Sequence, residues 1–168
     1  MPEIPGYRLE LVCAFTSKGD PQAKQRPRTV RRQGRNGKTQ IRTYTPRETF
    51  DYEWKISRSA RRCGKPGPGQ TLAPEGVPLL LVARFIFARP KYMLAKKYPA
   101  GLLIKHSAPD ADNLLKSCAD GIEKATNIVR NDSQFAGVHG LKFYAERGGE
   151  ARTEIEVYTM VAEAVPAD

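Results

Sequence analysis

Two aspartates separated by one residue, Asp110 and Asp112, stand where an irregular basic segment gives way to a helical pattern. Lys116 follows one helical turn later, and Asp132 adds a third carboxylate twenty residues beyond Asp112. Hard divalent cations such as Mg²⁺ prefer carboxylate oxygens and keep coordination positions for water and phosphate. Acids gathered in a strongly basic chain therefore indicate a divalent-metal site that acts on a phosphodiester.

Each of these residues also has a purely structural explanation. Asp112 is a favoured residue for helix N-capping, and Asp110 after a proline is typical of a turn. Lys116 either neutralises charge that develops on a phosphate or is a surface lysine paired with Asp120 at i, i+4. The Asp-x-Asp pattern is weak by itself, and the later Asp132 makes the metal interpretation much stronger.

Positive charge is concentrated in the first part of the chain. Residues 1–65 contain 16 Lys and Arg against 6 Asp and Glu, whereas residues 66–168 contain 12 of each. A basic run without acids repels itself unless a polyanion is near, which favours binding to a nucleic-acid backbone. The alternative is a solvated basic loop. The residues expected to contact nucleic acid are Lys24, Arg26, Arg28, Arg31 and Arg32.

The elements that must position these residues begin with a strand. Residues 8–15 alternate apolar and polar side chains, which predicts a half-buried strand. Residues 17–43 are rich in Gly, Lys, Arg and Gln without periodicity, which predicts a long basic loop. A short ribbon around residues 40–44 is an alternative interpretation for that part of the loop.

A first helix is expected after this loop. Thr45 as cap, Pro46 at the first position and Glu48 three residues after the cap are typical of a helix start. We expect the helix to run to about Arg62, before a Gly/Pro-rich connector at residues 64–76. The residues expected to be buried at helical spacing are Phe50, Trp54 and Ser57.

The second half of the chain predicts a strand, a helix and two further strands. Within residues 77–87, both faces of residues 79–87 are largely apolar, which favours a central strand. A second helix is expected from Asp112 to about Thr126, and residues 141–145 and 155–161 alternate around Gly148-Gly149 as a closing hairpin. The apolar stripe expected on this helix is Leu115, Cys118, Ala119 and Ile122.

The resulting order, β-α-β-α-β-β, predicts an α+β fold in which helices pack on one mixed sheet. The length fits a single domain over residues 1–168, with a loose tail at residues 163–168. No apolar run reaches membrane-spanning length, and no signal peptide is visible. The three cysteines lie far apart and are odd in number, as expected of reduced thiols in a cytoplasmic protein.

Four features together resemble the RusA family, the crossover-junction endodeoxyribonucleases of bacteria and their phages. The resemblance covers about residues 8–160, and its specific element is Pro109-Asp110-Ala111-Asp112-Asn113-Leu114-Leu115-Lys116. The other features are Lys24-Gln25-Arg26-Pro27-Arg28, Tyr44 before the first helix, and Asn131-Asp132-Ser133-Gln134 ahead of a strand containing Lys142.

The resemblance implies a homodimer in the bacterial cytoplasm that acts on branched DNA in recombination and repair. Such an enzyme binds four-way (Holliday) junctions and makes paired, symmetric nicks with Mg²⁺, for which Mn²⁺ is a possible substitute. The family's metal-binding aspartates correspond to Asp110, Asp112 and Asp132 of this chain, and its catalytic lysine corresponds to Lys116.

The chain departs from the family pattern in three places. Asn131 stands where the family often has a further aspartate, Ala108 stands where a lysine commonly precedes the Pro-Asp pair, and the connector at residues 64–76 is longer than usual. None of these removes a core acid, so we expect activity to survive.

Two other functions stay open at this stage. One is a non-catalytic nucleic-acid-binding module of the same fold, and the other is a structure-specific nuclease with another branched substrate. The acids favour catalysis, because a pure binder gains nothing from carboxylates that face a phosphate.

Overall fold

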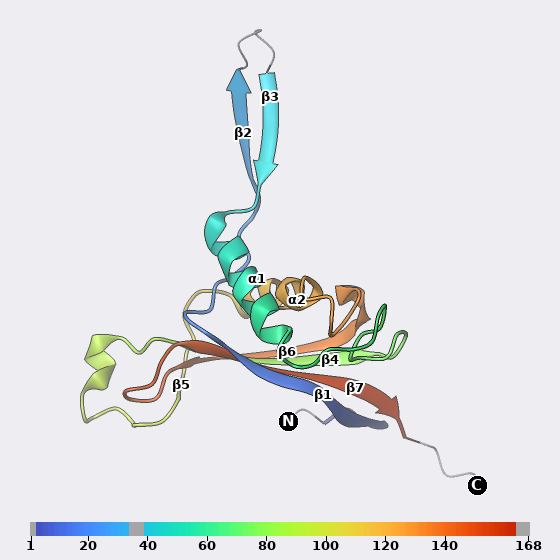
Figure 1. Cartoon of the computed structure of the whole chain (residues 1–168). Coiled ribbons are helices and arrows are strands. Elements are labelled where there is room, and N and C mark those ends of the chain that lie inside the picture. Colours follow the sequence, from blue (N-terminus) through green and yellow to red (C-terminus); the bar gives the residue numbers. More distant parts are fainter. Residues whose placement is uncertain (1–2, 34–38, 164–168) are drawn as a thin grey trace.

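Among residues 3–33 and 39–163, which the computed structural model describes, five strands form one mixed sheet (Figure 1). The strands lie in the order β1-β7-β4-β6-β5; β4 and β6 are parallel, and the other neighbours are antiparallel. Their bounds are β1 Tyr7–Lys18, β4 Leu79–Phe87, β5 Leu103–Ile104, β6 Phe135–Tyr144 and β7 Arg152–Ala162.

Both α-helices of the described chain pack on the same face of this sheet (Figure 1). They are α1 (Arg47–Ala60) and α2 (Ala111–Glu123), and the short 3-10 helices η1 (Lys91–Leu94) and η2 (Asp132–Gln134) lie in the connections. The predicted α+β fold is confirmed, and β1, α1, β4, α2, β6 and β7 follow the predicted order. Within the described residues, no helix has the length and apolar character needed to span a membrane.

Strand β4 occupies the middle of the sheet, as its apolar composition predicts. Leu81 and Phe85 are fully buried on the helix side, and Leu80 and Val82 are nearly as buried on the other side. An apolar strand buries most of its surface when other strands flank it on both edges, and β4 lies between β6 and β7. The predicted closing hairpin is therefore wrong, because β6 and β7 each pair with β4 rather than with one another.

The segment predicted as a long loop at residues 17–43, with a short ribbon as an alternative around residues 40–44, contains a longer two-stranded ribbon. β1 extends to Lys18, and β2 (Arg28–Gln33) pairs antiparallel with β3 (Thr39–Tyr44). The ribbon projects away from the sheet and helices (Figure 1), and its described side chains are exposed. Because neither face is buried, the ribbon needs no alternation of apolar and polar residues, and periodicity could not reveal it.

Helix α1 buries a different face from the one predicted. Ser57 is buried, but Phe50 is 54% exposed and Trp54 is 46% exposed. The buried apolar face comprises Tyr52, Ile56 and Ala60. The hydroxyl groups of Tyr52 and Thr153 are hydrogen bonded at 2.7 Å, which orients this face toward β7. The helix also starts one residue later than predicted, with Pro46 rather than Thr45 as its N-cap.

Helix α2 lies close to its predicted position. It begins at Ala111 and ends at Glu123, three residues before the predicted end. Its predicted stripe faces the core, where Cys118 and Ile122 are fully buried and Leu115 and Ala119 are partly buried. Of the predicted tail, residues 164–168 lie outside the described residues.

The three cysteines are free thiols in the structure, as the sequence predicts. Burial raises the pKa of both the Cys13 and Cys118 thiols, so these groups stay protonated and unreactive in the folded protein. They contribute as small apolar side chains, and no chemistry is assigned to them.

The two helices approach closely at Gly121. A Cβ added there would lie 2.7 Å from Cβ of Ile56 and 2.9 Å from the backbone oxygen of Glu53. Neither contact is tolerable, and one of them involves the α1 backbone. Glycine at this position therefore sets the separation of α1 and α2.

We expect Gly121→Ala to lower the free energy of unfolding by about 1–3 kcal/mol, because the added methyl overpacks the helix contact. Chemical denaturation measures this change. Gly101→Ala is the matched control, since a Cβ at Gly101 meets no atom within 4 Å. Equal stability of the two variants would contradict the close helix contact.

Candidate active site

The turn that precedes α2 is held by two lysines from the edge of the sheet. Lys105 Nζ donates to Ser107 Oγ at 2.6 Å and also to the backbone oxygens of Ser107 and Ala108. Lys142 Nζ donates to the backbone oxygens of Ser107 and Pro109, at 2.9 and 2.7 Å. These charge-assisted bonds determine where the chain enters α2, immediately before the candidate acids.

Asp110 is the N-cap residue of α2. Its backbone is extended, with φ −72° and ψ 141°, and its backbone oxygen accepts a hydrogen bond from the Leu114 N–H at 3.2 Å. Its side chain makes no capping hydrogen bond and is exposed. The carboxylate of Asp110 is therefore left available, although it does not line the cavity formed by the other candidate residues.

A cavity of about 260 Å³ brings Asp112, Lys116 and Asp132 together, as expected for a shared site. Asp112 and Lys116 come from the exposed flank of α2, and Asp132 comes from η2. Lys116 Nζ lies 3.6 Å from Asp112 Oδ2. The expected alternative partner of Lys116, Asp120, also lines the cavity, whose apolar wall is Leu115, Ala119, Phe135 and Val138.

The residue before Asp132 has a structural role. The side-chain oxygen of Asn131 accepts a hydrogen bond from the Ser133 N–H at 2.8 Å and so caps η2. Asparagine is among the best residues for this role. The departure from aspartate at this position thus keeps the turn that presents Asp132.

Asp120 is tied to a network of buried and half-buried charges. Its carboxylate contacts Lys24, whose Nζ also lies 3.8 Å from Oε1 of Glu53. The Glu53 side chain is only 2% exposed and makes a second ion pair with Lys124. A buried carboxylate is costly unless it is paired. Lys124 Nζ donates a hydrogen bond to Glu53 Oε2, whereas Glu53 Oε1 has no hydrogen-bond partner among the described residues and faces only the more distant charge of Lys24.

Lys24, which was expected to contact nucleic acid, belongs to this network. Its ammonium is occupied by Asp120 and Glu53, and its backbone N–H donates to the Asn113 backbone oxygen at 2.9 Å. Lys24 therefore anchors the base of the ribbon beside α2. The sequence indicated only Lys116 as a possible partner of Asp120, and gave no signal for Lys24 in that role.

The other expected contacts to nucleic acid lie on or beside the ribbon. Arg26 precedes β2, and Arg28, Arg31 and Arg32 are exposed on it. Across residues 3–33 and 39–163, none of these four arginines forms an ion pair. Their charges are therefore free to meet a polyanion.

The donor set around the cavity suits a hard divalent cation in its chemistry. All its carboxylates present oxygen ligands, and Mg²⁺ in proteins commonly takes one or two carboxylates together with water and substrate phosphate. In the described part of the chain, no three His, Cys, Asp or Glu side chains converge closely enough to form a complete protein site for a metal ion. Of the three expected metal ligands, Asp112 and Asp132 are the two that line this cavity.

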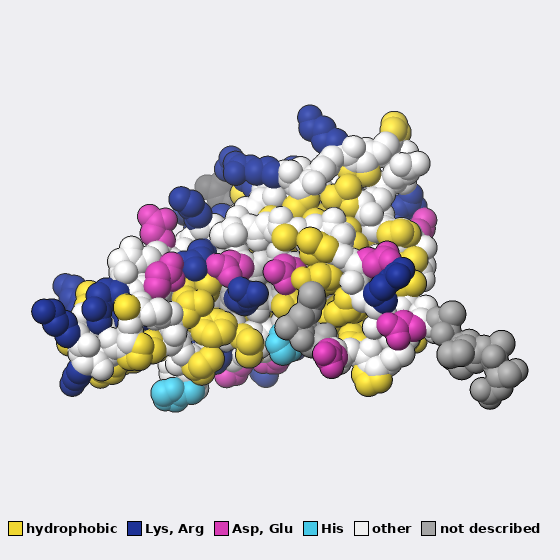
Figure 2. Space-filling view, turned by 90° about the horizontal axis from the view of Figure 1, so that it is seen from below, with side chains coloured by type: hydrophobic (Ala, Val, Ile, Leu, Met, Phe, Trp, Pro, Cys, Tyr) yellow, Lys and Arg dark blue, Asp and Glu magenta, His cyan; other side chains and the backbone are white. Residues whose placement is uncertain are grey.

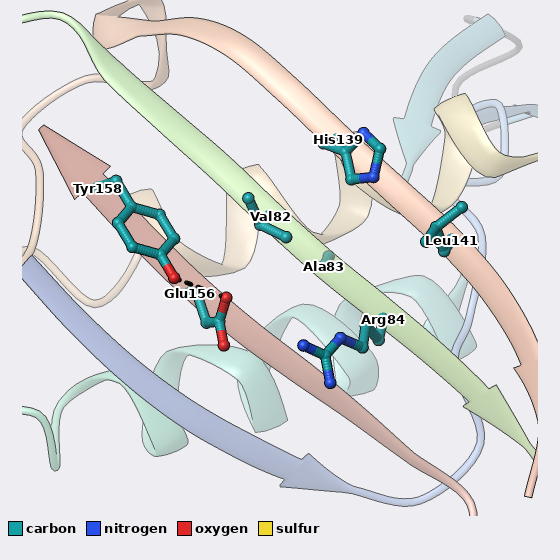
Figure 3. A pocket seen from close by; sticks show the side chains of 7 residues that line it. All are labelled: Val82, Ala83, Arg84, His139, Leu141, Glu156 and Tyr158. Atoms are coloured by element: carbon teal, nitrogen blue, oxygen red, sulfur yellow. Dashed lines mark hydrogen bonds between the residues drawn. The ribbon is translucent and has the colours of Figure 1, made fainter. Parts of the chain in front are cut away.

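A larger hollow, of about 530 Å³, lies on the sheet itself (Figure 3). Its lining includes Arg84 from β4, His139 from β6 and the Tyr158–Glu156 pair from β7, in which the tyrosine hydroxyl donates at 2.8 Å. Seen from below, this side of the molecule mixes hydrophobic and charged side chains (Figure 2). Glu156 is its single lining acid, so it lacks the paired carboxylates of the α2 cavity.

The family model described as Endodeoxyribonuclease RusA matches residues 18–158 of this chain. The match spans the ribbon, both helices, the turn before α2 and the strands that hold them. No match was found among curated proteins.

We expect Lys105→Met to loosen the turn before α2, because a side chain only 8% exposed would lose all its hydrogen bonds to residues 107 and 108. The free energy of unfolding should fall by about 1.5–3 kcal/mol. Hydrogen exchange at the first turn of α2 should accelerate. Lys96→Met, which removes an exposed charge of the same type, is the control and should leave exchange unchanged.

Proposed function

The chain belongs to the RusA family of endodeoxyribonucleases, and we propose that it resolves four-way DNA junctions by paired, symmetric hydrolysis of phosphodiester bonds. The observation that carries this proposal is the cavity shared by Asp112, Lys116 and Asp132. Carboxylates beside a lysine suit a reaction in which negative charge accumulates on a phosphate.

In this proposal Asp112 and Asp132 hold Mg²⁺, with Mn²⁺ as a possible substitute, and Asp110 supplies a further carboxylate at the helix N-terminus. Bound Mg²⁺ would supply charge neutralisation at the scissile phosphate and would acidify a water molecule. The lysines that fix the turn before α2 position the backbone from which Asp110 and Asp112 project.

Lys116 is the proposed stabiliser of the transition state. Its ammonium lies beside Asp112, and both side chains are about two-thirds exposed, at 64% and 66%. A lysine held there can turn from its aspartate toward a phosphate oxygen that gains charge during hydrolysis. Asp120, neutralised by Lys24, borders the same cavity without adding an unpaired charge.

The ribbon is the proposed DNA-binding element. Arg26, Arg28, Arg31 and Arg32 would contact phosphates along the junction arms, which gives affinity without reading sequence. Their exposure and lack of described acidic partners support this role. A homodimer, acting in the cytoplasm of a bacterial host, would present two such sites to strands of opposite arms and so produce paired nicks.

We expect Asp112→Asn to abolish cleavage of a synthetic four-way junction in Mg²⁺ while junction binding persists, because only the metal site is changed. The assay compares labelled junction with linear duplex of the same sequence. Glu150→Gln, which removes one negative charge from an exposed turn, is the control and should cleave like the wild type.

Cleavage by Asp112→Asn at the wild-type rate would overturn the assignment of the site. Tight junction binding by the wild type with no cleavage in Mg²⁺ or Mn²⁺ would instead favour a non-catalytic binding module. Preferential cleavage of another branched substrate would support the proposed phosphodiester hydrolysis but overturn the four-way junction as the substrate.

We expect Arg26→Ala to weaken junction binding and to flatten its dependence on salt. Loss of one phosphate contact should reduce the slope of log K against log[salt] by about one. Arg8→Ala is the control, since Arg8 lies on β1 and already pairs with Glu10. An unchanged slope for Arg26→Ala would show that Arg26 does not contact phosphate.

A further inference from the structure

One face of α1 and its C-cap residue carries an exposed stripe in which two large aromatic residues lie between arginines. Spacings of three and four residues place its members on the same side of the helix. All of them are exposed, and they are called the α1 stripe below: Arg47, Phe50, Trp54, Arg58 and Arg61.

The two aromatic rings of the α1 stripe are not part of the hydrophobic core. Phe50 is 54% exposed and Trp54 is 46% exposed, so each leaves about half of its surface in water. Both rings are instead approached by cations. The guanidinium of Arg61 lies 5.5 Å from the Trp54 ring centroid, and Lys124 Nζ lies 5.7 Å from that of Phe50. Exposed rings beside cations suit a ligand that combines flat apolar surfaces with negative charge.

The α1 stripe continues the basic surface of the ribbon. β3 leads directly into α1 through Tyr44, whose side chain is 43% exposed, and the ribbon projects from that end of the helix (Figure 1). All the charged members of the stripe are arginines, and Arg47 pairs with the neighbouring Asp51 at 3.4 Å. A strand of DNA that leaves the ribbon would therefore meet rings and cations in succession.

The α1 stripe is also connected to the candidate active site. Lys124 contacts both the Phe50 ring and the Glu53 carboxylate, and Glu53 pairs with Lys24. Lys24 in turn contacts Asp120, which lines the catalytic cavity. The Phe50 end of the stripe is thus in contact with the charge network that borders the cavity.

We propose that the α1 stripe binds unpaired bases of branched DNA by stacking them on Trp54 and Phe50, with its arginines contacting the adjoining phosphates. This inference rests on the proposed function, because it takes the junction as substrate. Every base has a flat face, so aromatic stacking holds unpaired nucleotides without selecting their sequence. At a branch point the continuous stacking of the duplex arms is interrupted, so the bases there are the ones that a ring can reach.

The competing occupant of the α1 stripe is a second copy of this chain. In a two-fold interface the same patch occurs on both subunits, so the stripe would face its own arginines if it lay on the axis. Like charges brought together in this way oppose association. A polyanion with stackable bases matches both components of the stripe, and DNA is the occupant that the charges favour.

The test uses the only tryptophan of the chain, Trp54, as a fluorescent reporter. The full-length protein is titrated, in buffer with EDTA so that cleavage is prevented, with a four-way junction, a short single-stranded oligonucleotide or a linear duplex. Stacking predicts strong quenching of Trp54 emission at saturation by the junction and the single strand, and weaker quenching by the duplex. Saturated binding of the junction without quenching would overturn the proposal.

Substitutions at Trp54 separate stacking from simple apolar contact. Trp54→Leu should weaken binding of the junction by about fivefold or more, whereas Trp54→Phe, which keeps a ring, should largely retain it. Tyr7→Leu removes an aromatic residue of similar exposure from β1 and should bind as the wild type does. Wild-type affinity in Trp54→Leu would contradict the assignment.

Two further outcomes distinguish this proposal from its competitors. If Trp54 emission depends on protein concentration without DNA, and Trp54→Leu alters the oligomeric state in ultracentrifugation, the stripe is a protein interface. Junction cleavage in Mg²⁺, measured in parallel, tests the proposed function separately. Cleavage without quenching of Trp54 emission overturns only the proposal that the α1 stripe stacks bases. Absence of both cleavage and junction binding overturns that proposal and the proposed junction resolution.

Discussion

The buried carboxylate of Glu53 is the interaction on which the arrangement of the other parts depends. It lies where α1 meets α2, almost without exposure to solvent, and is paired with Lys24 and Lys124. Loss of one partner from a buried charge pair is strongly destabilising, because the remaining charge is left without compensation. The pairing therefore joins three separate pieces of chain: helix α1, the end of α2 and the segment that leads into the ribbon.

This constraint places two surfaces of different chemistry beside one another. Lys24 neutralises Asp120 at the edge of the candidate catalytic cavity, while Lys124 reaches over the ring of Phe50 on α1. At the other end of α2, two lysines from the sheet edge hold the turn that carries the first aspartates. The helix that presents Asp112 and Lys116 is thus fixed at both ends, as a preorganised site requires.

Much of the candidate site could be predicted from the sequence, because its residues are local to one helix start. The Asp110 to Lys116 motif carries its own geometry, since a proline, an N-cap position and i, i+4 spacing are short-range features. Asp132 could be proposed but not placed, because its position depends on how η2 packs against α2. Lys105 gave no signal, as nothing in its neighbours indicates that its ammonium is buried against backbone oxygens.

By itself, the sequence determined the α+β class, the long elements and the central place of β4, and it supplied the acids proposed for the site. Those features follow from periodicity, capping and charge, which act over a few residues. Only the tertiary structure decided that β4 separates β6 from β7, that a ribbon replaces the basic loop and that α1 buries Tyr52 and Ile56. Periodicity shows which residues share a face of a helix. Whether Phe50 and Trp54 or a paired Glu53 turns inward depends on partners distant in the chain, because burial of a charge is decided by what neutralises it.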